Sequence, residues 1–403
     1  MRKGIAFALA LFAVMAVSAA FAAGTEVTPG VTDDKIVIGY TMPMSGALGY
    51  MGSQTAYATE AIFKKYNDQG GIYGRKLVLV KYDSGMDAGQ ALANYRKLIL
   101  EDKVFAILFG FGSFIRPAYS FFEEQKVPWL FPWAPSEDVM FPARKYLFGL
   151  FPTTASQMKV EANWIIDQGK WKRLACIYGD SASGKTGLDM LKEILKDSPV
   201  KLVAAEAIPT DATSAAVQVA KVGMANPDMV LMIGMTHAPA ATIIREVKKV
   251  GLKTDLMVQM SLIGPTIPKL LAGINLDGLY GAWWGNIQYP SSQATETKQM
   301  KELRLLLMKS NPEVFTDSTV GGNVEHGLSV EVFIEALRRA GKDLTREGLI
   351  KAFETMKNYD TGKGNFATFS PTRREGIAGG FVIQIQKGDW VPVSSWIDVD
   401  VGN

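Results

Sequence analysis

The sequence predicts an α/β protein built from two doubly wound lobes, each with a parallel sheet. Apolar runs of strand length, such as KIVIGY and MVLMIGM, alternate with segments of helical period along the chain. Most of these runs are continuously apolar, which is typical of parallel strands covered by helices on both faces. A chain of 403 residues is too long for one such core, so we expect two lobes.

The expected elements follow one another in a regular order. Strands are expected at residues 35–40, 76–83, 105–110, 127–133, 173–180, 201–208, 229–235, 256–261, 279–285 and 380–386. Helical period predicts helices over residues 53–71, 88–103, 156–169, 187–197, 215–224 and 238–251. In the first helix, Ala58, Ile62 and Tyr66 form an apolar stripe. Ser53 is placed to cap its start, and Gly70 to end it.

The alternation of strands and helices is broken at three places, near residues 147–157, 274–286 and 358–371. A single linker between two domains would need only one such break. We therefore expect the chain to cross between the lobes three times. The N-terminal lobe is expected to comprise residues 31–150 and 282–360, and the C-terminal lobe residues 151–281 and 361–403.

The first residues are typical of a secretory signal peptide, expected over residues 1–23. The start MRK is basic, GIAFALALFAVMAVSAA is apolar, and AFAAG supplies small residues at the exit. A membrane anchor is the alternative reading of this run. The small residues favour cleavage after Ala22 or Ala23, which would place the mature protein in the periplasm. No later stretch is apolar over the ~20 residues that a membrane-spanning helix needs.

Composition argues against several classes of function. Lys and Arg total 43 and Asp and Glu total 40, without a basic cluster of the kind that binds nucleic acid. Cys176 is the single cysteine, and His237 and His326 are the two histidines. This set is too small for a Cys–His metal site or for histidine-based catalysis, and each histidine is expected to be structural. We expect no enzyme activity, no metal and no cofactor.

Residues 179–186 read GDSASGKT and match the G-x-x-x-x-G-K-[ST] pattern of a phosphate-binding loop. The motif also follows an apolar run, RLACIY, as such a loop should. Against nucleotide binding, the run MVLMIGM ends without the acidic residue that would help to hold Mg²⁺. A secreted protein would also meet almost no ATP.

Ligands of open parallel sheets bind beyond the carboxyl ends of the strands. The segments expected there are MPMSGALGYMGS, GFGSFIRP, PWAPSED, GDSASGK, GMTHAPA and QMSLIGP. They offer hydrogen-bond donors and apolar walls, but no base, nucleophile pair or metal cluster. The sequence therefore favours capture of a small molecule over catalysis.

These segments resemble a known family. GVTDDKIVIGYTMPMSGALGYMG, NDQGGIYGRKLVLVKYDSGMDAGQALANYRKLILEDKVFAILFGFGS, VGLKTDLMV and LDGLYG are similar to segments of the periplasmic substrate-binding proteins of ABC transporters, in the branched-chain amino acid group. The resemblance runs from about residue 31 to the C-terminus. Ala47 stands where proline is common in the family.

The resemblance implies the type I periplasmic-binding fold, with two lobes joined by a three-strand hinge. Such a protein traps a small-molecule ligand by hinge closure and passes it to ABC permease subunits in the inner membrane. A monomer is implied as well. A sensory receptor on the same fold is the alternative. In the family, the GDSASGKTG stretch faces the cleft, with Ser183 where tyrosine is usual. The phosphate-loop match would then be a coincidence.

The resemblance also implies ligand-binding residues in the first lobe, where main-chain amides and hydroxyl groups hold the ligand carboxylate. The matching positions are Tyr50, Gly112, Ser113, Trp133, Ala134 and Ser136. Tyr50 would pack on the ligand and Trp133 would form a wall. Ser113 and Ser136 are also placed to be helix N-caps, and capping alone is the alternative role.

The second lobe departs from the family pattern. Amino-acid binders hold the ligand's ammonium there with a carboxylate and aromatic rings, but Met260 stands at the acidic position. The tyrosine positions match Ser183 and either Met235 or Thr236. We therefore expect a ligand without an ammonium group, an aromatic or aliphatic acid.

Its apolar body would face Met235, Met260, Trp133 and Trp284, which in the alternative reading are simply core residues. Binding of a branched-chain amino acid, an amide or urea is the other possibility.

Overall fold

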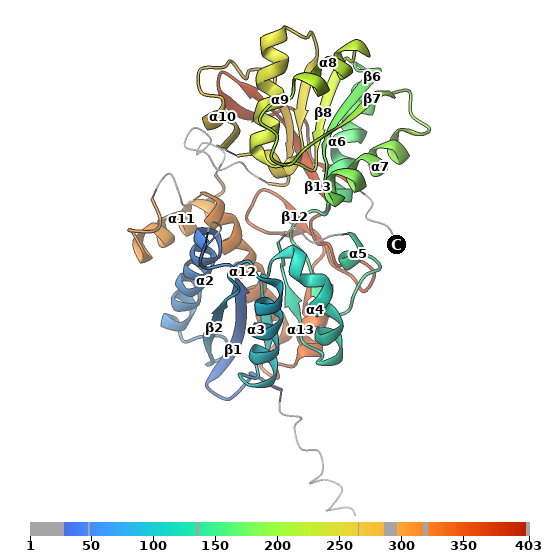
Figure 1. Cartoon of the computed structure of the whole chain (residues 1–403). Helices are drawn as coiled ribbons and strands as arrows, with labels where there is room; N and C mark the ends of the chain where they lie inside the picture. Colours follow the sequence, from blue (N-terminus) through green and yellow to red (C-terminus); the bar gives the residue numbers. More distant parts are fainter. Residues whose placement is uncertain are drawn as a thin grey trace, which may run out of the picture.

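The computed structural model describes residues 28–46, 49–133, 137–264, 266–285, 296–316 and 321–399. Two lobes lie one above the other (Figure 1), each with its own sheet. This confirms the predicted α/β class with parallel sheets. The expected signal peptide lies outside the described residues. Among those that are described, no helix has the length and apolarity to cross a bilayer.

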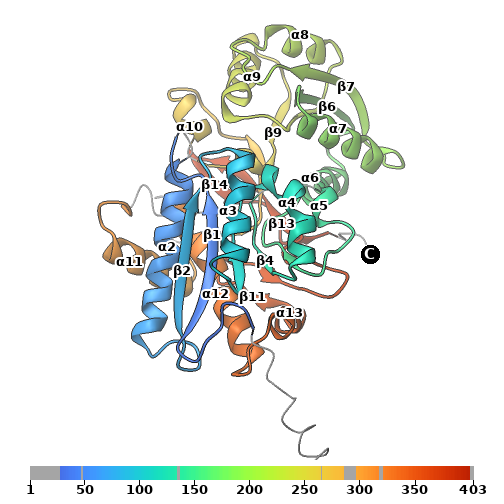
Figure 2. The ribbon, with the colours of Figure 1, turned by 60° about the horizontal axis from the view of Figure 1, so that its bottom comes forward.

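The first lobe has a five-stranded sheet with the order β2-β1-β3-β4-β5, and every neighbouring pair is parallel. Its strands are β1 (Lys35–Met42), β2 (Lys76–Asp83), β3 (Ala106–Leu108), β4 (Trp129–Leu130) and β5 (Leu147–Phe148). Its helices are α2 (Gly49–Asp68), α3 (Ala88–Leu100), α4 (Gly112–Glu124), α5 (Glu137–Met140), α11 (Lys298–Ser310), α12 (Gly321–Ala340) and α13 (Arg346–Glu354). Figure 2 shows α2 and α3 alongside β1 and β2.

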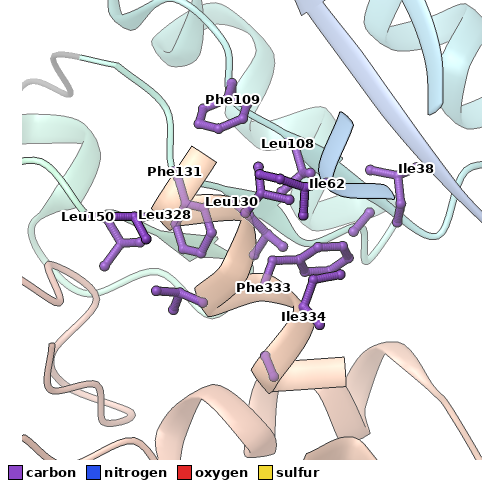
Figure 3. Close-up of a cluster of buried hydrophobic side chains, with 14 of the residues drawn as sticks. Ile38, Ile62, Leu108, Phe109, Leu130, Phe131, Leu150, Leu328, Phe333 and Ile334 are labelled. Atoms are coloured by element: carbon purple, nitrogen blue, oxygen red, sulfur yellow. The ribbon is translucent and has the colours of Figure 1, made fainter. Parts of the chain in front are cut away.

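Continuously apolar strands are buried from both sides in this lobe, as their sequence predicts. On one face, Ile38, Leu108 and Leu130 meet residues of α2 and α12, among them Ile62 and Phe333 (Figure 3). On the other face, Tyr95 of α3 and Phe122 of α4 pack on the sheet against Trp129 of β4. The rings of Phe122 and Trp129 are stacked with centroids 4.3 Å apart. Helices on both faces are what a doubly wound sheet requires.

The second lobe has an eight-stranded sheet with the order β14-β13-β10-β9-β8-β6-β7, and β15 pairs with β13. Its strands are β6 (Arg173–Gly179), β7 (Lys201–Ile208), β8 (Met229–Ile233), β9 (Asp255–Val258), β10 (Tyr280–Trp283), β13 (Gly379–Gln386), β14 (Asp389–Pro392) and β15 (Ile397–Asp398). Its helices are α6 (Thr154–Gln168), α7 (Ala182–Leu195), α8 (Ala216–Met224), α9 (His237–Val250), α10 (Thr266–Leu270) and the 3₁₀ helix η1 (Met260–Leu262).

The edge of this sheet differs from the expected all-parallel arrangement, because β13 runs antiparallel to β10, β14 and β15. Strands β13 and β14 are joined by Lys387 and Gly388, both with positive φ, 53° and 85°. Two such residues form the tight hairpin turn that fits the twist of paired strands. A hairpin can only join antiparallel neighbours, so this turn sets the direction of β14.

Three helix starts expected from the sequence are wrong, and one of them is that of α7, which begins at Ala182 rather than at residue 187. Helix α2 begins at Gly49 rather than after Ser53, whose hydroxyl donates to the carbonyl of Met44 at 3.1 Å. Helix α4 begins at Gly112 with Phe111 at the N-cap, so Ser113 lies in its first turn instead of capping it. In α2 and α4 the helix starts before the serine that the sequence placed at its N-cap.

The first and third crossings run side by side. The amide of Gly149 donates to the carbonyl of Arg374, and the carbonyl of Gly149 accepts from Gly376, both at 2.8 Å. The Glu375 carboxylate accepts from the amide of Thr153 at 2.7 Å. Burial raises the pKa of Glu375 to about 7.

We propose that the two lobes follow the two sheets, with one change to the expected boundaries. Ala367, Phe369 and Ile377 are buried in the same core cluster as Phe148 and Phe353 of the first lobe. Strands β11 (Tyr359–Asp360) and β12 (Phe366–Ala367) pair with each other in this region. The third crossing is therefore better placed near residue 377 than near residue 360.

Candidate functional site

An aromatic cluster lies where the two lobes meet, and we refer to it as the boundary cluster. It consists of Phe109, Trp133, Phe151, Trp284 and His326. Phe109 and Trp133 follow β3 and β4, Phe151 lies in the first crossing, Trp284 follows β10, and His326 is on α12. The carboxyl ends of strands from both sheets thus contribute to one group of rings, at the place where ligands of α/β proteins bind.

The rings of the boundary cluster are in close contact. Trp133 is stacked on His326 with centroids 4.2 Å apart and 26° between the planes. Phe151 lies 6.5 Å from Trp133 and 5.9 Å from Trp284. Trp284 is in turn stacked on Trp283 at 3.9 Å. The structure therefore brings Trp133 and Trp284, which the sequence expected to face the ligand's apolar body, to the same ring, that of Phe151.

Sequence reasoning missed Phe151 and treated His326 as structural. Phe151 lies in the segment LFGLFPTTASQ, which from the sequence indicates only a break between the lobes. His326 has no neighbouring residue in the sequence that suggests binding. Its position on α12, facing Trp133, is a result of tertiary packing.

Two buried charged residues lie behind the boundary cluster. The Glu325 carboxylate accepts from Trp283 Nε1 at 3.2 Å, and Lys363 Nζ donates to Ser329 Oγ at 2.8 Å. Lys363 Nζ also lies 5.4 Å from the centre of the Phe151 ring. Lys363 is 0% exposed and Glu325 5% exposed. Residues of α12, of the first crossing, of the end of β10 and of the turn between β11 and β12 therefore meet here.

Burial changes the ionisation of these groups. It raises the pKa of Glu325 to about 7, against the attraction of Lys363. It lowers the pKa of Lys363 to about 8. The pKa of His326 falls to about 3 through burial and the neighbouring Lys363 charge, so its imidazole is neutral at neutral pH.

A carboxyl group that could not be assigned to this place from the sequence lies next to Met260. The amide of Met260 donates to Glu161 Oε1 at 2.9 Å, and both residues are fully buried. Desolvation raises the pKa of Glu161 to about 8, so this group is largely uncharged at neutral pH. The signal was Glu161, an acidic residue between the apolar residues Val160 and Ala162 in the helix expected at residues 156–169.

The other expected site residues differ in their burial and in the elements on which they lie. Met235 is 8% exposed and packs in a core cluster of the second lobe. Tyr50 is 59% exposed, in the first turn of α2. Ser183 is exposed in α7, and Thr236 is exposed as the N-cap of α9. Gly112 and Ser113 open α4, while Ala134 and Ser136 lie outside the described residues.

The phosphate-loop motif does not form a phosphate loop in the structure. Strand β6 ends at Gly179 and α7 begins at Ala182, so only two residues separate them. Ser181 Oγ caps the helix by accepting from the amide of Gly184 at 3.1 Å. Lys185 lies inside the helix and pairs with Asp180 at 2.8 Å. A phosphate loop instead needs a longer turn whose free amides surround the anion.

Replacing Gly184 by alanine is expected to destabilise the protein by about 1–3 kcal/mol, because a Cβ atom there would lie 2.0 Å from the carbonyl oxygen of Gly179. Urea unfolding measures the loss. Gly223→Ala is the matched control, since its Cβ would meet Leu252 at an ordinary 3.5 Å within α8. It should be neutral or slightly stabilising. Equal behaviour of the two variants would contradict the tight β6–α7 turn.

Two α/β lobes with mainly parallel sheets, between which the chain crosses three times, form the architecture of the type I periplasmic-binding proteins. Residues 35–389 match the family described as periplasmic binding protein. The chain therefore belongs to this family of substrate-binding proteins. Within the described residues, no group of three or more His, Cys, Asp or Glu is arranged to hold a metal ion.

Curated relatives and solved structures agree with this family. The chain is 26% identical over 246 residues to a Leu/Ile/Val/Thr-binding protein of Salmonella typhimurium, covering 61% of this chain and 67% of that protein. It is 27% identical to an amino acid binding protein of Pseudomonas aeruginosa, covering 64% and 65% of the two chains. The matches to a Leu/Ile/Val-binding protein of Citrobacter freundii span 64% of that relative.

Two solved structures show the same fold. A branched-chain amino acid ABC transporter protein from Thermus thermophilus with bound valine has a TM-score of 0.75 and 18% identity, covering 92% of this chain and 98% of its own. A fatty acid ABC transporter substrate-binding protein from Thermomonospora curvata has a TM-score of 0.72 and 22% identity, covering 94% and 96%.

Proposed function

We propose that this protein is an extracytoplasmic solute-binding protein that captures a small carboxylate-bearing ligand between its lobes and delivers it to an ABC importer. Family membership and the two-lobed fold support this role. Closure of the lobes about their crossings would enclose the ligand, and permease subunits in the inner membrane would receive it. We further propose that residues 1–23 direct secretion and are removed, and that the protein acts as a monomer.

The proposed ligand class is inferred from the groups that surround Met260. A ligand ammonium group needs a negative charge or a ring face to offset its desolvation. The carboxyl group next to Met260, that of Glu161, is held by burial in its uncharged form at neutral pH. It is also bonded to a backbone amide. The boundary cluster adds flat apolar rings, which suit an aromatic or branched aliphatic acid.

Binding of a branched-chain amino acid is the second candidate. The names of the curated relatives and the valine-bound structure from Thermus thermophilus favour it. The Glu325 carboxylate beside the boundary cluster is the acidic group that could serve such a ligand. Lys363 already occupies the neighbourhood of that carboxylate, which argues for the acid ligand instead.

Thermal unfolding in the presence of candidate ligands distinguishes the two. Benzoate or 3-methylbutanoate is expected to raise the melting temperature by about 2 °C or more at concentrations well above Kd, because a ligand that binds only the folded state stabilises it. Leucine is expected to leave the melting temperature unchanged. A clear shift with leucine, where the acids have no effect, would establish the second candidate and refute the first.

A further inference from the structure

Three buried polar atoms of the boundary cluster have no hydrogen-bond partner among the residues that the structure describes. They are Trp133 Nε1, Trp284 Nε1 and His326 Nδ1. Trp133 is only 8% exposed. Burying a polar group without a partner costs about 1–3 kcal/mol, and most such groups in folded proteins have one. Three of them in a single group of touching rings indicate that a further molecule supplies the partner.

An indole without a partner is not in itself a site, as two other tryptophans show. Trp164 Nε1 and Trp390 Nε1 are also buried, with no hydrogen-bond partner in the described part of the chain. Both belong to core clusters of the second lobe, where Trp164 packs on Trp171 and Tyr280. Trp133 and Trp284 differ because they follow strands of different lobes, at the place where ligands of this fold are expected.

The chemistry of the three atoms limits what can satisfy them. An indole nitrogen only donates a hydrogen bond, while a neutral imidazole has one donor and one acceptor nitrogen. An ammonium group cannot accept from the indoles and would be repelled by the neighbouring Lys363. A hydroxyl group accepts from an indole and can donate to an imidazole or accept from it, so it suits either tautomer of His326.

We propose that Trp133, Trp284 and His326 form a polar subsite that binds a hydroxyl group of the ligand. This inference rests on the proposed function, since it assumes that an acid is bound between the lobes. It makes the ligand a hydroxylated acid with a flat apolar body, whose ring packs on the aromatic side chains of the boundary cluster. Trp133, Trp284 and His326 would determine specificity.

Isothermal titration with 4-hydroxybenzoate and benzoate tests the proposal. The wild-type protein is expected to bind 4-hydroxybenzoate about tenfold more tightly, the ratio that one net hydrogen bond provides. Trp284→Phe keeps a ring but removes the N–H group, and it should reduce this ratio to about one. His326→Phe should reduce it as well. The ratio compares two ligands on one folded variant, so a general loss of affinity does not alter it.

Trp164→Phe is the matched control, because it removes an unpartnered indole that lies outside the boundary cluster. It should retain the tenfold preference. Equal affinity of wild-type protein for the two acids would overturn the polar subsite and leave the proposed function standing. If neither acid binds and leucine does, both proposals are wrong. Retention of the preference in Trp284→Phe and in His326→Phe would also overturn the subsite.

Discussion

Replacing Glu161 by glutamine is expected to stabilise the protein strongly above neutral pH and to have little effect near pH 5. Glu161 is fully buried, and desolvation raises its pKa from 4.5 to about 8. Glutamine has nearly the same shape, carries no charge at any pH, and keeps an oxygen for the amide of Met260. The stability difference between variant and wild type should grow by roughly 3–5 kcal/mol between pH 5 and pH 8.5.

The direction of this effect follows from proton binding. Between pH 4.5 and pH 8, the unfolded chain loses the Glu161 proton while the folded protein keeps it. The folded state then binds more protons, so its stability falls as the pH rises. Above the folded-state pKa both states are ionised, and the loss of stability caused by the buried charge of Glu161 reaches its full size. Below pH 4.5 both are protonated, and the penalty disappears.

Urea unfolding at several pH values measures the difference, and Glu161→Leu provides the control. Leucine also removes the titrating group but leaves the amide of Met260 without its acceptor. The two variants should therefore show parallel pH dependence and differ by a constant amount, about 1–3 kcal/mol in favour of glutamine. A stability difference between Glu161→Gln and wild type that does not change with pH would contradict the buried, uncharged carboxyl group.

Replacing Lys363 by methionine is expected to cost about 3–5 kcal/mol of stability at pH 8. Removing one partner of a buried charged pair leaves the other charge uncompensated. Here the remaining charge would be Glu325, which is 5% exposed and would keep Trp283 Nε1 as its hydrogen-bond donor. Ser329 keeps a partner in the variant, because its hydroxyl donates to the carbonyl of Glu325 at 3.2 Å.

The double variant Lys363→Met with Glu325→Gln distinguishes loss of the interaction between the two charges from loss of side-chain packing. Glutamine removes the charge and still offers an oxygen to Trp283. Replacing both members of a buried pair by uncharged groups is often close to neutral. The double variant should therefore recover at least half of the stability lost by Lys363→Met. Losses of the two single changes that simply add would show that Glu325 and Lys363 do not interact.

The sequence predicted the strands and the two-lobed organisation well, because continuously apolar runs report burial on both sheet faces. Strand β2, for example, spans Lys76–Asp83, as expected. The pattern was less informative at the ends of elements. The run at residues 256–261 yields β9 only as far as Val258 and then turns into η1. The antiparallel edge depends on the hairpin at Lys387 and Gly388, which hydrophobic pattern does not encode.

The site was only partly accessible from sequence. Trp133 and Trp284 could be found because aromatic residues directly after strands point to the ligand edge. Glu325 and Lys363 could not be paired, since they lie on different elements and only the packing of α12 against the turn between β11 and β12 brings them together. The remaining ligand-binding residues stay predictions.

The pairing of the first and third crossings has a mechanical consequence. Gly149 is hydrogen-bonded on both sides to residues next to Glu375, and Glu375 is bonded to Thr153. Two hydrogen-bonded segments bend as one ribbon and resist sliding past each other. Rotation of one lobe about its long axis would break these hydrogen bonds. Bending of the two segments together keeps them. We therefore expect the proposed closure of the lobes to follow this bending motion.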